Sequence, residues 1–351
     1  MLTTLAAPVK GLPGIGIRIF NAYLSHSLSS LVLEWEVLLN GAVIQRGRAP
    51  VLPIAPQHSG TIRLPARIPP GQNEVFLNVC YRLKRTGSSL PTDQVIARDQ
   101  FRLREYTGDL SIRPAGELSF LDEGGTFTIT SATTGLDMQF NKQTGWLQRY
   151  TVGGRPLMVD SVGLITDLGR VSSIAQEPKL QLFSTSTSTD MAIVRSDYTI
   201  PETPFLLHAR YTINARGEMQ VEQRLEVDTT LSRDTMAGQP ALQYPPLFGM
   251  KWPLPAGFDS VLYYGRLPED VAGDSCHHNY SGLYRPGPED TVTRIDIRWW
   301  KLTDGQGHGL LITADSSLLH IRTLKKQLDI DHPVTSAEKD GYHYLYKVTP
   351  Q

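Results

Sequence analysis

Cysteine is scarce in this chain: of 351 residues, only Cys80 and Cys276 carry a thiol. Two thiols cannot build a disulfide framework, and neither has a second cysteine at the short spacing of a zinc site. We expect both to be reduced and packed among other side chains rather than joined in a bridge. The cysteines therefore leave the redox compartment of the protein open.

Long hydrophobic runs and an excess of either charge are also missing. No stretch approaches the about 18 apolar residues that cross a bilayer, so no membrane partner is expected. The chain has 34 Lys and Arg against 35 Asp and Glu, a net charge of -1, so no nucleic-acid partner is expected either. Met1–Thr4 show no charged segment followed by an apolar block, so no signal peptide is visible. The cytoplasm and the periplasm both stay open as locations.

Helical periodicity is absent from every long window, and strand patterns take its place. Leu33, Trp35 and Val37 alternate with polar residues, and Asn40-Gly41 is the pair that best suits a tight hairpin turn. A second alternating run covers residues 75–83. Short strands at this spacing predict that residues 1–105 form an immunoglobulin-like β-sandwich.

Residues 106–114 are polar and predict a linker, after which strand patterns continue to the end of the chain. Alternating apolar residues mark strands over 207–213 and 219–227. Antiparallel strands throughout residues 115–351 must close on one another, because open sheet edges are a liability. The sequence therefore predicts an all-β protein whose second domain is a large sandwich or barrel.

Several short strings are more specific than these patterns. They are Leu33-Glu34-Trp35-Glu36-Val37, Asn40-Gly41, Ile54-Ala55-Pro56, Phe76-Leu77-Asn78-Val79, Asp99-Gln100-Phe101-Arg102-Leu103, Phe140-Asn141-Lys142-Gln143-Thr144-Gly145-Trp146-Leu147, Phe248-Gly249-Met250, Tyr264-Gly265-Arg266, Arg298-Trp299-Trp300 and Gly307-His308-Gly309-Leu310. In this order and spacing, the chain resembles the carboxy-terminal third of glycoside hydrolase family two β-galactosidases over roughly residues 15 to 350. The resemblance implies an immunoglobulin-like domain over 1–105, a linker over 106–114 and a galactose-mutarotase-like β-supersandwich over 115–351.

The resemblance also implies what the chain lacks. In that family the acid/base and nucleophile glutamates and the magnesium ligands lie in a (β/α)₈ barrel, and this sequence has no alternating strand–helix pattern to build one. Retaining glycosidases need two carboxylates about 5–5.5 Å apart, and no motif here supplies them. We therefore expect no catalytic residue, metal or cofactor in this chain, and magnesium only in a catalytic barrel domain or subunit that would be its partner.

Four residues are candidates for contact with carbohydrate: Arg266, Glu269, Trp299 and Trp300. Arg266 and Glu269 stand where the family has Gly-Arg-Gly-Pro followed by Glu-Asn, and they could pin a turn as an ion pair or bind a sugar hydroxyl. Trp299 and Trp300 are adjacent on a predicted strand and so point to opposite faces. One is expected in the core, and the other could stack on a sugar ring.

Other polar groups are weaker candidates. Cys276-His277-His278 lacks further ligands at usable spacing and predicts a loop, and Asp329-Ile330-Asp331-His332 predicts a solvated loop rather than a calcium site. His208, His308 and His320 could each pair with a carboxylate as the general acid–base of a mutarotase.

The resemblance predicts a non-catalytic C-terminal region or small subunit of a β-galactosidase. The whole enzyme would hydrolyse terminal β-galactosides, and this part would brace the barrel and shape the rim of its active site. The alternatives are a stand-alone carbohydrate-binding module and a mutarotase-like protein. Homo-oligomer contacts are left open.

Overall fold

The computed structural model describes residues 2–8, 14–49, 53–84, 94–167, 177–201, 203, 205–227, 247–266, 280–286, 293–324, 326–331 and 342–351. Strands make up most of them, with one 3-10 turn over Leu28–Ser30. No helix in these ranges is long and apolar enough to cross a membrane. The chain divides into two compact units, Met1–Thr107 with Arg266–Leu283 and Gly108–Gly265 with Tyr284–Gln351. Of the described residues, Arg266 and 280–283 thus group with the first unit, which the order of the sequence alone does not suggest.

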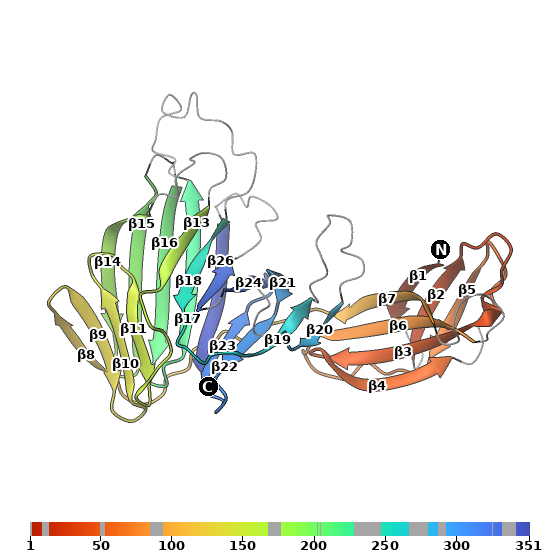
Figure 1. The fold of residues 1–351 in the computed structure, drawn as a ribbon, viewed down its shortest axis with the longest axis horizontal. Helices are drawn as coiled ribbons and strands as arrows, with labels where there is room; N and C mark the ends of the chain where they lie inside the picture. Colours follow the sequence, from red (N-terminus) through yellow and green to blue (C-terminus); the bar gives the residue numbers. More distant parts are fainter. Residues whose placement is uncertain are drawn as a thin grey trace. The chain divides into compact units, whose positions relative to one another are not determined.

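The first unit is an immunoglobulin-like sandwich of two antiparallel sheets (Figure 1). The three-stranded sheet has the order β1-β2-β5, with β1 Leu2–Pro8, β2 Ile15–Asn21 and β5 Ser59–Leu64. The four-stranded sheet has the order β4-β3-β6-β7, with β3 Leu31–Leu39, β4 Ala42–Ala49, β6 Val75–Leu83 and β7 Val95–Arg104. Buried residues from both sheets form one core, so the sheets pack face to face.

Strand β3 follows the predicted alternation. Leu33, Trp35 and Val37 are buried in the core, while the carboxylates between them face outward. Asn40 and Gly41 both have positive φ, as the predicted hairpin turn between β3 and β4 requires. The outer face of the four-stranded sheet is therefore left to polar side chains.

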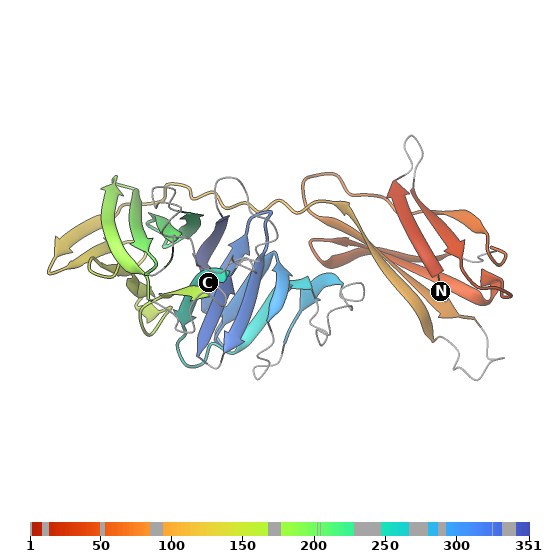
Figure 2. The same cartoon turned by 90° about the horizontal axis from the view of Figure 1, so that it is seen from above.

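The second unit contains three antiparallel sheets (Figures 1 and 2). The first five-stranded sheet, β12-β11-β10-β9-β8, has β8 Ser119–Glu123, β9 Thr126–Ser131, β10 Leu136–Asn141, β11 Leu147–Val152 and β12 Arg155–Pro156. The second, β13-β18-β25-β24-β21, has β13 Gly163–Asp167, β18 Leu247–Pro253, β21 Arg294–Ile297, β24 Leu319–Leu324 and β25 Gln327–Asp331. The nine-stranded sheet, β14-β15-β16-β17-β26-β23-β22-β19-β20, has β14 Lys179–Thr187, β15 Met191–Thr199, β16 Phe205–Asn214, β17 Met219–Val227, β19 Ser260–Arg266, β20 Ser281–Tyr284, β22 Trp299–Thr303, β23 Gly309–Ala314 and β26 Tyr342–Pro350.

Both five-stranded sheets pack on the nine-stranded sheet and share one core with it. Tyr211 on β16 contacts Phe140 on β10 with 5.1 Å between ring centroids. Tyr344 on β26 contacts Phe248 on β18 at 5.0 Å. This confirms the predicted all-β supersandwich. The opposite face of the nine-stranded sheet carries charged residues, because hydrophobic and polar positions alternate along β15, β16 and β17.

Candidate functional site

Two of the predicted carbohydrate contacts belong to the segment that leaves β19. Arg266 is the last residue of that strand and is half-buried. Glu269 lies outside the described residues, so the predicted pairing of Arg266 with Glu269 stays a prediction.

The two adjacent tryptophans lie on opposite faces of β22, as their spacing predicts. Trp300 is fully buried and stacks on Tyr263, with ring centroids 5.0 Å apart and an interplanar angle of 17°. No face of its ring is open to a sugar, so Trp300 is corrected to a core residue. Trp299 is half-buried, and its ring lies 6.5 Å from that of Tyr264. Of the pair, only Trp299 keeps the surface that a stacking platform needs.

Two buried arginines accompany these aromatic rings, and the sequence patterns did not single them out as a site. Arg294 lies over the rings of Tyr263 and Trp300, at 5.5 and 5.7 Å from their centroids. Arg298 lies 5.2 Å from the centroid of Tyr264 and donates to the backbone carbonyl of Asp296 at 2.6 Å. Both arginines are almost inaccessible to solvent. Cation–π contacts stabilise such buried guanidinium groups, which here hold the β21–β22 region together.

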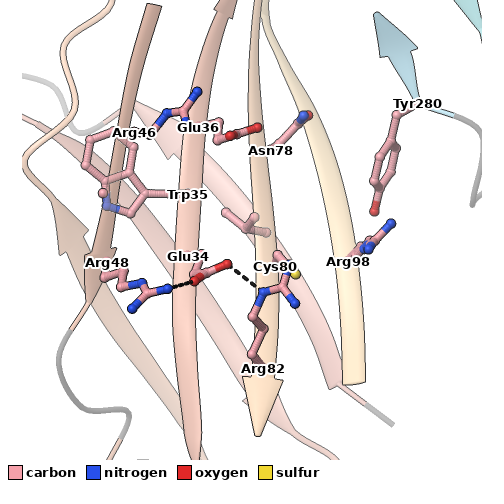
Figure 3. A pocket seen from close by; sticks show the side chains of 12 residues that line it. Glu34, Trp35, Glu36, Arg46, Arg48, Asn78, Cys80, Arg82, Arg98 and Tyr280 are labelled. Carbon is pink, nitrogen blue, oxygen red and sulfur yellow. Dashed lines mark hydrogen bonds and ion pairs between the residues drawn. The ribbon is translucent and has the colours of Figure 1, made fainter. Parts of the chain in front are cut away.

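A groove of about 550 Å³ lies on the outer face of the four-stranded sheet, within the first unit (Figure 3). Every strand of the sheet contributes charged or polar side chains to it, and Tyr280 adds an aromatic ring. The lining side chains that carry charge or a thiol are Glu34, Glu36, Arg46, Arg48, Cys80, Arg82 and Arg98. Sequence reasoning missed this groove, because the residues come from strands that pair only in the folded chain.

Glu34 forms ion pairs with two arginines of the groove. One carboxylate oxygen lies 2.6 Å from Arg48 Nη2 and the other accepts a hydrogen bond from Arg82 Nε, also at 2.6 Å. Burial alone would raise the pKa of Glu34, but the hydrogen bonds and charges of Arg82 and Arg48 outweigh it and hold the pKa below its ordinary value. Glu34 therefore stays ionised between two guanidinium groups.

The segment Tyr280-Ser281 lies along one side of this groove. Ser281 pairs twice with the side-chain amide of Gln100: its N–H donates to Oε1 at 2.8 Å, and its carbonyl accepts from Nε2 at 2.9 Å. Asn78 accepts a further hydrogen bond from Gln100 at 2.8 Å. These two hydrogen bonds attach Ser281 to the side chain of Gln100 on β7. The residue before Ser281, Tyr280, lines the groove.

A second, smaller hollow of about 350 Å³ lies on the charged face of the nine-stranded sheet. His208 Nδ1 is 2.8 Å from Asp197 Oδ1, across the β15–β16 pair. Arg224 lies opposite His208 on β17, and His343 lies opposite Arg224 on β26. Of the three predicted histidines, His208 thus lines this hollow beside a carboxylate.

The remaining weak candidates are two histidines near aspartates and the segment that contains Asp329 and Asp331. His308 lies 3.5 Å from Asp304, and His320 lies 3.4 Å from Asp331. The predicted solvated loop at Asp329 and Asp331 is wrong: both lie on β25 inside a sheet and are buried, and Asp329 pairs with Arg322 at 2.9 Å.

Metal-binding side chains do not cluster in the part of the chain that the structure describes. No group of three or more His, Cys, Asp or Glu residues there could hold an ion. The Cys276-His277-His278 string lies outside the described residues. Cys80 has a free thiol on the outer face of β6.

Comparison with known families matches both units in sequence order. The family described as "Beta-galactosidase, domain 4" matches residues 17–104. The family described as "Beta galactosidase small chain" matches residues 132–335, more than half of the chain. The chain belongs to the β-galactosidase small chain family. This confirms the resemblance found in the sequence strings.

Curated relatives of this family member are longer proteins. A β-galactosidase of Priestia megaterium (strain DSM 319 / IMG 1521) is 23% identical over 98% of this chain and 34% of its own length. One of Lactobacillus delbrueckii subsp. bulgaricus is 22% identical over 92% of this chain and 32% of its own. The chain therefore spans about a third of the length of the curated relatives that it matches.

Solved structures give weaker similarities. Galactose 1-epimerase from Lactobacillus acidophilus NCFM is 10% identical with a TM-score of 0.41, over 68% of this chain and 99% of that one. An α-mannosidase from Enterococcus faecalis V583 is 9% identical with a TM-score of 0.36, over 100% of this chain and 41% of that one. Similarities at this level support no argument about function.

Proposed function

We propose that this chain is a non-catalytic C-terminal region or small subunit of a β-galactosidase. One observation carries the proposal: two β-galactosidase families match the chain in order, while the matching relatives are about three times as long. The partner is a catalytic (β/α)₈ barrel, in the same or another polypeptide. Hydrolysis of terminal β-galactosides, and the magnesium that supports it, belong to that barrel.

The role of the chain is to brace the barrel and shape the rim of its active site. A supersandwich suits bracing, because three sheets share one core and present large rigid faces. Arg266, where β19 ends, and the half-buried Trp299 are the residues through which the chain would reach a bound carbohydrate. Contacts between copies of the whole enzyme are a further use of these faces.

The test is hydrolysis of a chromogenic β-galactoside by the purified full chain, with and without magnesium. We expect no turnover by the chain alone, and turnover when it is mixed with the Priestia megaterium relative from which the matching third has been removed. The same truncated relative without this chain is the control. Turnover by this chain alone, or no effect on the truncated relative, would contradict the proposal.

A second candidate function is supported by the hollow beside His208. A histidine 2.8 Å from a carboxylate can move protons, which is what interconversion of sugar anomers requires. Polarimetry of freshly dissolved α-D-galactose tests this directly. A rate enhancement that His208→Gln abolishes and His343→Gln retains would support a mutarotase-like protein. No enhancement by the unmodified chain would remove it, leaving binding of galactose in the hollow to be measured by calorimetry.

A further inference from the structure

The groove on the four-stranded sheet carries more positive than negative charge. Four arginines and two glutamates line it, in a chain whose overall net charge is -1. The excess is therefore a local feature of this sheet face. Charges of one sign gathered in a groove attract ligands of the opposite sign.

The excess is concentrated at one corner. Glu34 divides its two oxygens between Arg48 and Arg82, so one carboxylate faces two guanidinium groups. Arg98 on β7 is the register partner of Cys80 on β6. Arg82 lies two residues after Cys80 on β6. The side chain of Arg98 forms no hydrogen bond or ion pair with the described residues, and it is exposed to the groove. Arg82 and Arg98 thus flank Cys80 on one face.

Tyr280 also lines this corner of the groove. Figure 3 shows its hydroxyl directed toward the guanidinium group of Arg98. Burial raises the pKa of Tyr280, and the nearby charge of Asp99 adds to this while Arg98 opposes it. The phenol therefore stays protonated at neutral pH and can donate a hydrogen bond. The corner offers donors from two arginines and one phenol.

We propose that this groove binds a small hydroxylated molecule through a carboxylate or phosphate group. The forked donors of Arg82 and Arg98 match the oxygens of such a group. Glu36 and Arg46, further along the groove, supply an acceptor and donors for hydroxyl groups on the rest of the ligand. A volume of about 550 Å³ is typical of sites for small molecules. The proposal does not rest on the proposed function, because it is argued only from the charges and contacts of the groove itself.

Titration of the full chain by isothermal calorimetry tests the proposal with three probes. D-Galacturonate and D-galactose differ mainly in a carboxylate, and inorganic phosphate supplies the other oxyanion without a sugar body. We expect galacturonate or phosphate to bind at least tenfold more tightly than galactose. Galacturonate alone would assign a sugar acid, whereas phosphate alone would assign a phosphorylated ligand.

Variants locate the site. Arg98→Gln should weaken binding of the anion about tenfold or more, because one charge-assisted contact is lost. Tyr280→Phe, which removes only the hydroxyl, should weaken it less. Arg102→Gln is the matched control: Arg102 lies on the same strand, pairs with Glu105 at 3.0 Å and does not line the groove.

Three results would overturn the proposal. They are no binding of either anion at millimolar concentration, equal binding of galactose and galacturonate with no binding of phosphate, and an equal loss in Arg98→Gln and Arg102→Gln. Unchanged hydrogen exchange of β6 and β7 in the variants would establish that they remain folded. Failure here would leave the β-galactosidase test unaffected, since that test measures turnover with a separate catalytic region.

Discussion

Glu34 pairs with two arginines of the groove at once. Its replacement by Gln keeps the shape but removes the charge that Arg48 and Arg82 share at 2.6 Å. We expect Glu34→Gln to destabilise the first unit by about 1 kcal/mol at pH 7, a modest value because Arg48 is largely exposed. Hydrogen exchange of β3 and β6 measures it, and Glu36→Gln on the same strand is the control, with no change expected.

The same carboxylate gives this effect a defined pH dependence. Its pKa is lowered in the folded chain, so its contribution to stability is present above the unfolded pKa of about 4.3 and is lost as the pH falls through the folded value. The difference between the unmodified chain and Glu34→Gln should therefore be constant above pH 5 and shrink below about 4.3. A difference that grows on acidification would show that the assigned direction is wrong.

Gly47 makes room for the largest side chain in the sandwich core. A Cβ atom at this position would lie 2.4 Å from Cζ2 of Trp35, its register partner on β3. We expect Gly47→Ala to cost about 1–3 kcal/mol, as overpacking does, and Trp35→Phe in the same chain to recover part of that loss. Urea unfolding measures both, and Gly305→Ala, whose Cβ would meet nothing within 4 Å, is the control.

At the scale of elements, strand β22 carries a half-buried tryptophan, Trp299, directly before a fully buried one, Trp300. Trp300→Ala should cost the second unit about 3–5 kcal/mol, because a fully buried ring stacked on Tyr263 is removed. Trp299→Ala should cost much less, since Trp299 is only half-buried. Hydrogen exchange of β19 and β22 distinguishes them. Equal costs would mean that Trp299 is also a core residue and no stacking platform.

Periodicity predicted the strands well, because alternation is a local property of the chain. The buried positions of β3 and β16 and the turn at Asn40 follow from neighbouring residues alone. The contact of Gln100 with Ser281 joins residues 181 positions apart, and no local pattern contains it. Asp329 was placed wrongly for a similar reason: its burial is set by the strands on both sides of β25.

The candidate site was harder to predict than the fold. Strings shared with a family indicated Arg266 and the two tryptophans, but a string does not say which ring faces solvent. The groove depends on the pairing order β4-β3-β6-β7, which sets Arg98 beside Cys80 and Cys80 beside Glu34. These charged residues are far apart in the sequence, so the groove can be recognised only when the strand order is known.

At the scale of the whole molecule, the buried residues form two separate hydrophobic cores, one in each unit. Units with their own cores unfold separately when little couples them. Leu33→Ala and Ile312→Ala each remove a fully buried side chain, one from each core, and each should cost its own unit about 2–5 kcal/mol. We therefore expect Leu33→Ala to speed hydrogen exchange in β3 and β6 while leaving β16 and β17 unchanged.

Ile312→Ala should do the reverse, which makes the two variants controls for each other. Leu24→Ala, at a residue that is 87% exposed, should change neither unit. If either core substitution speeds exchange equally in β3 and in β16, the chain unfolds as one cooperative body. Its two family matches would then mark parts of a single folding unit. Separate responses would instead mean that the two cores unfold independently of each other.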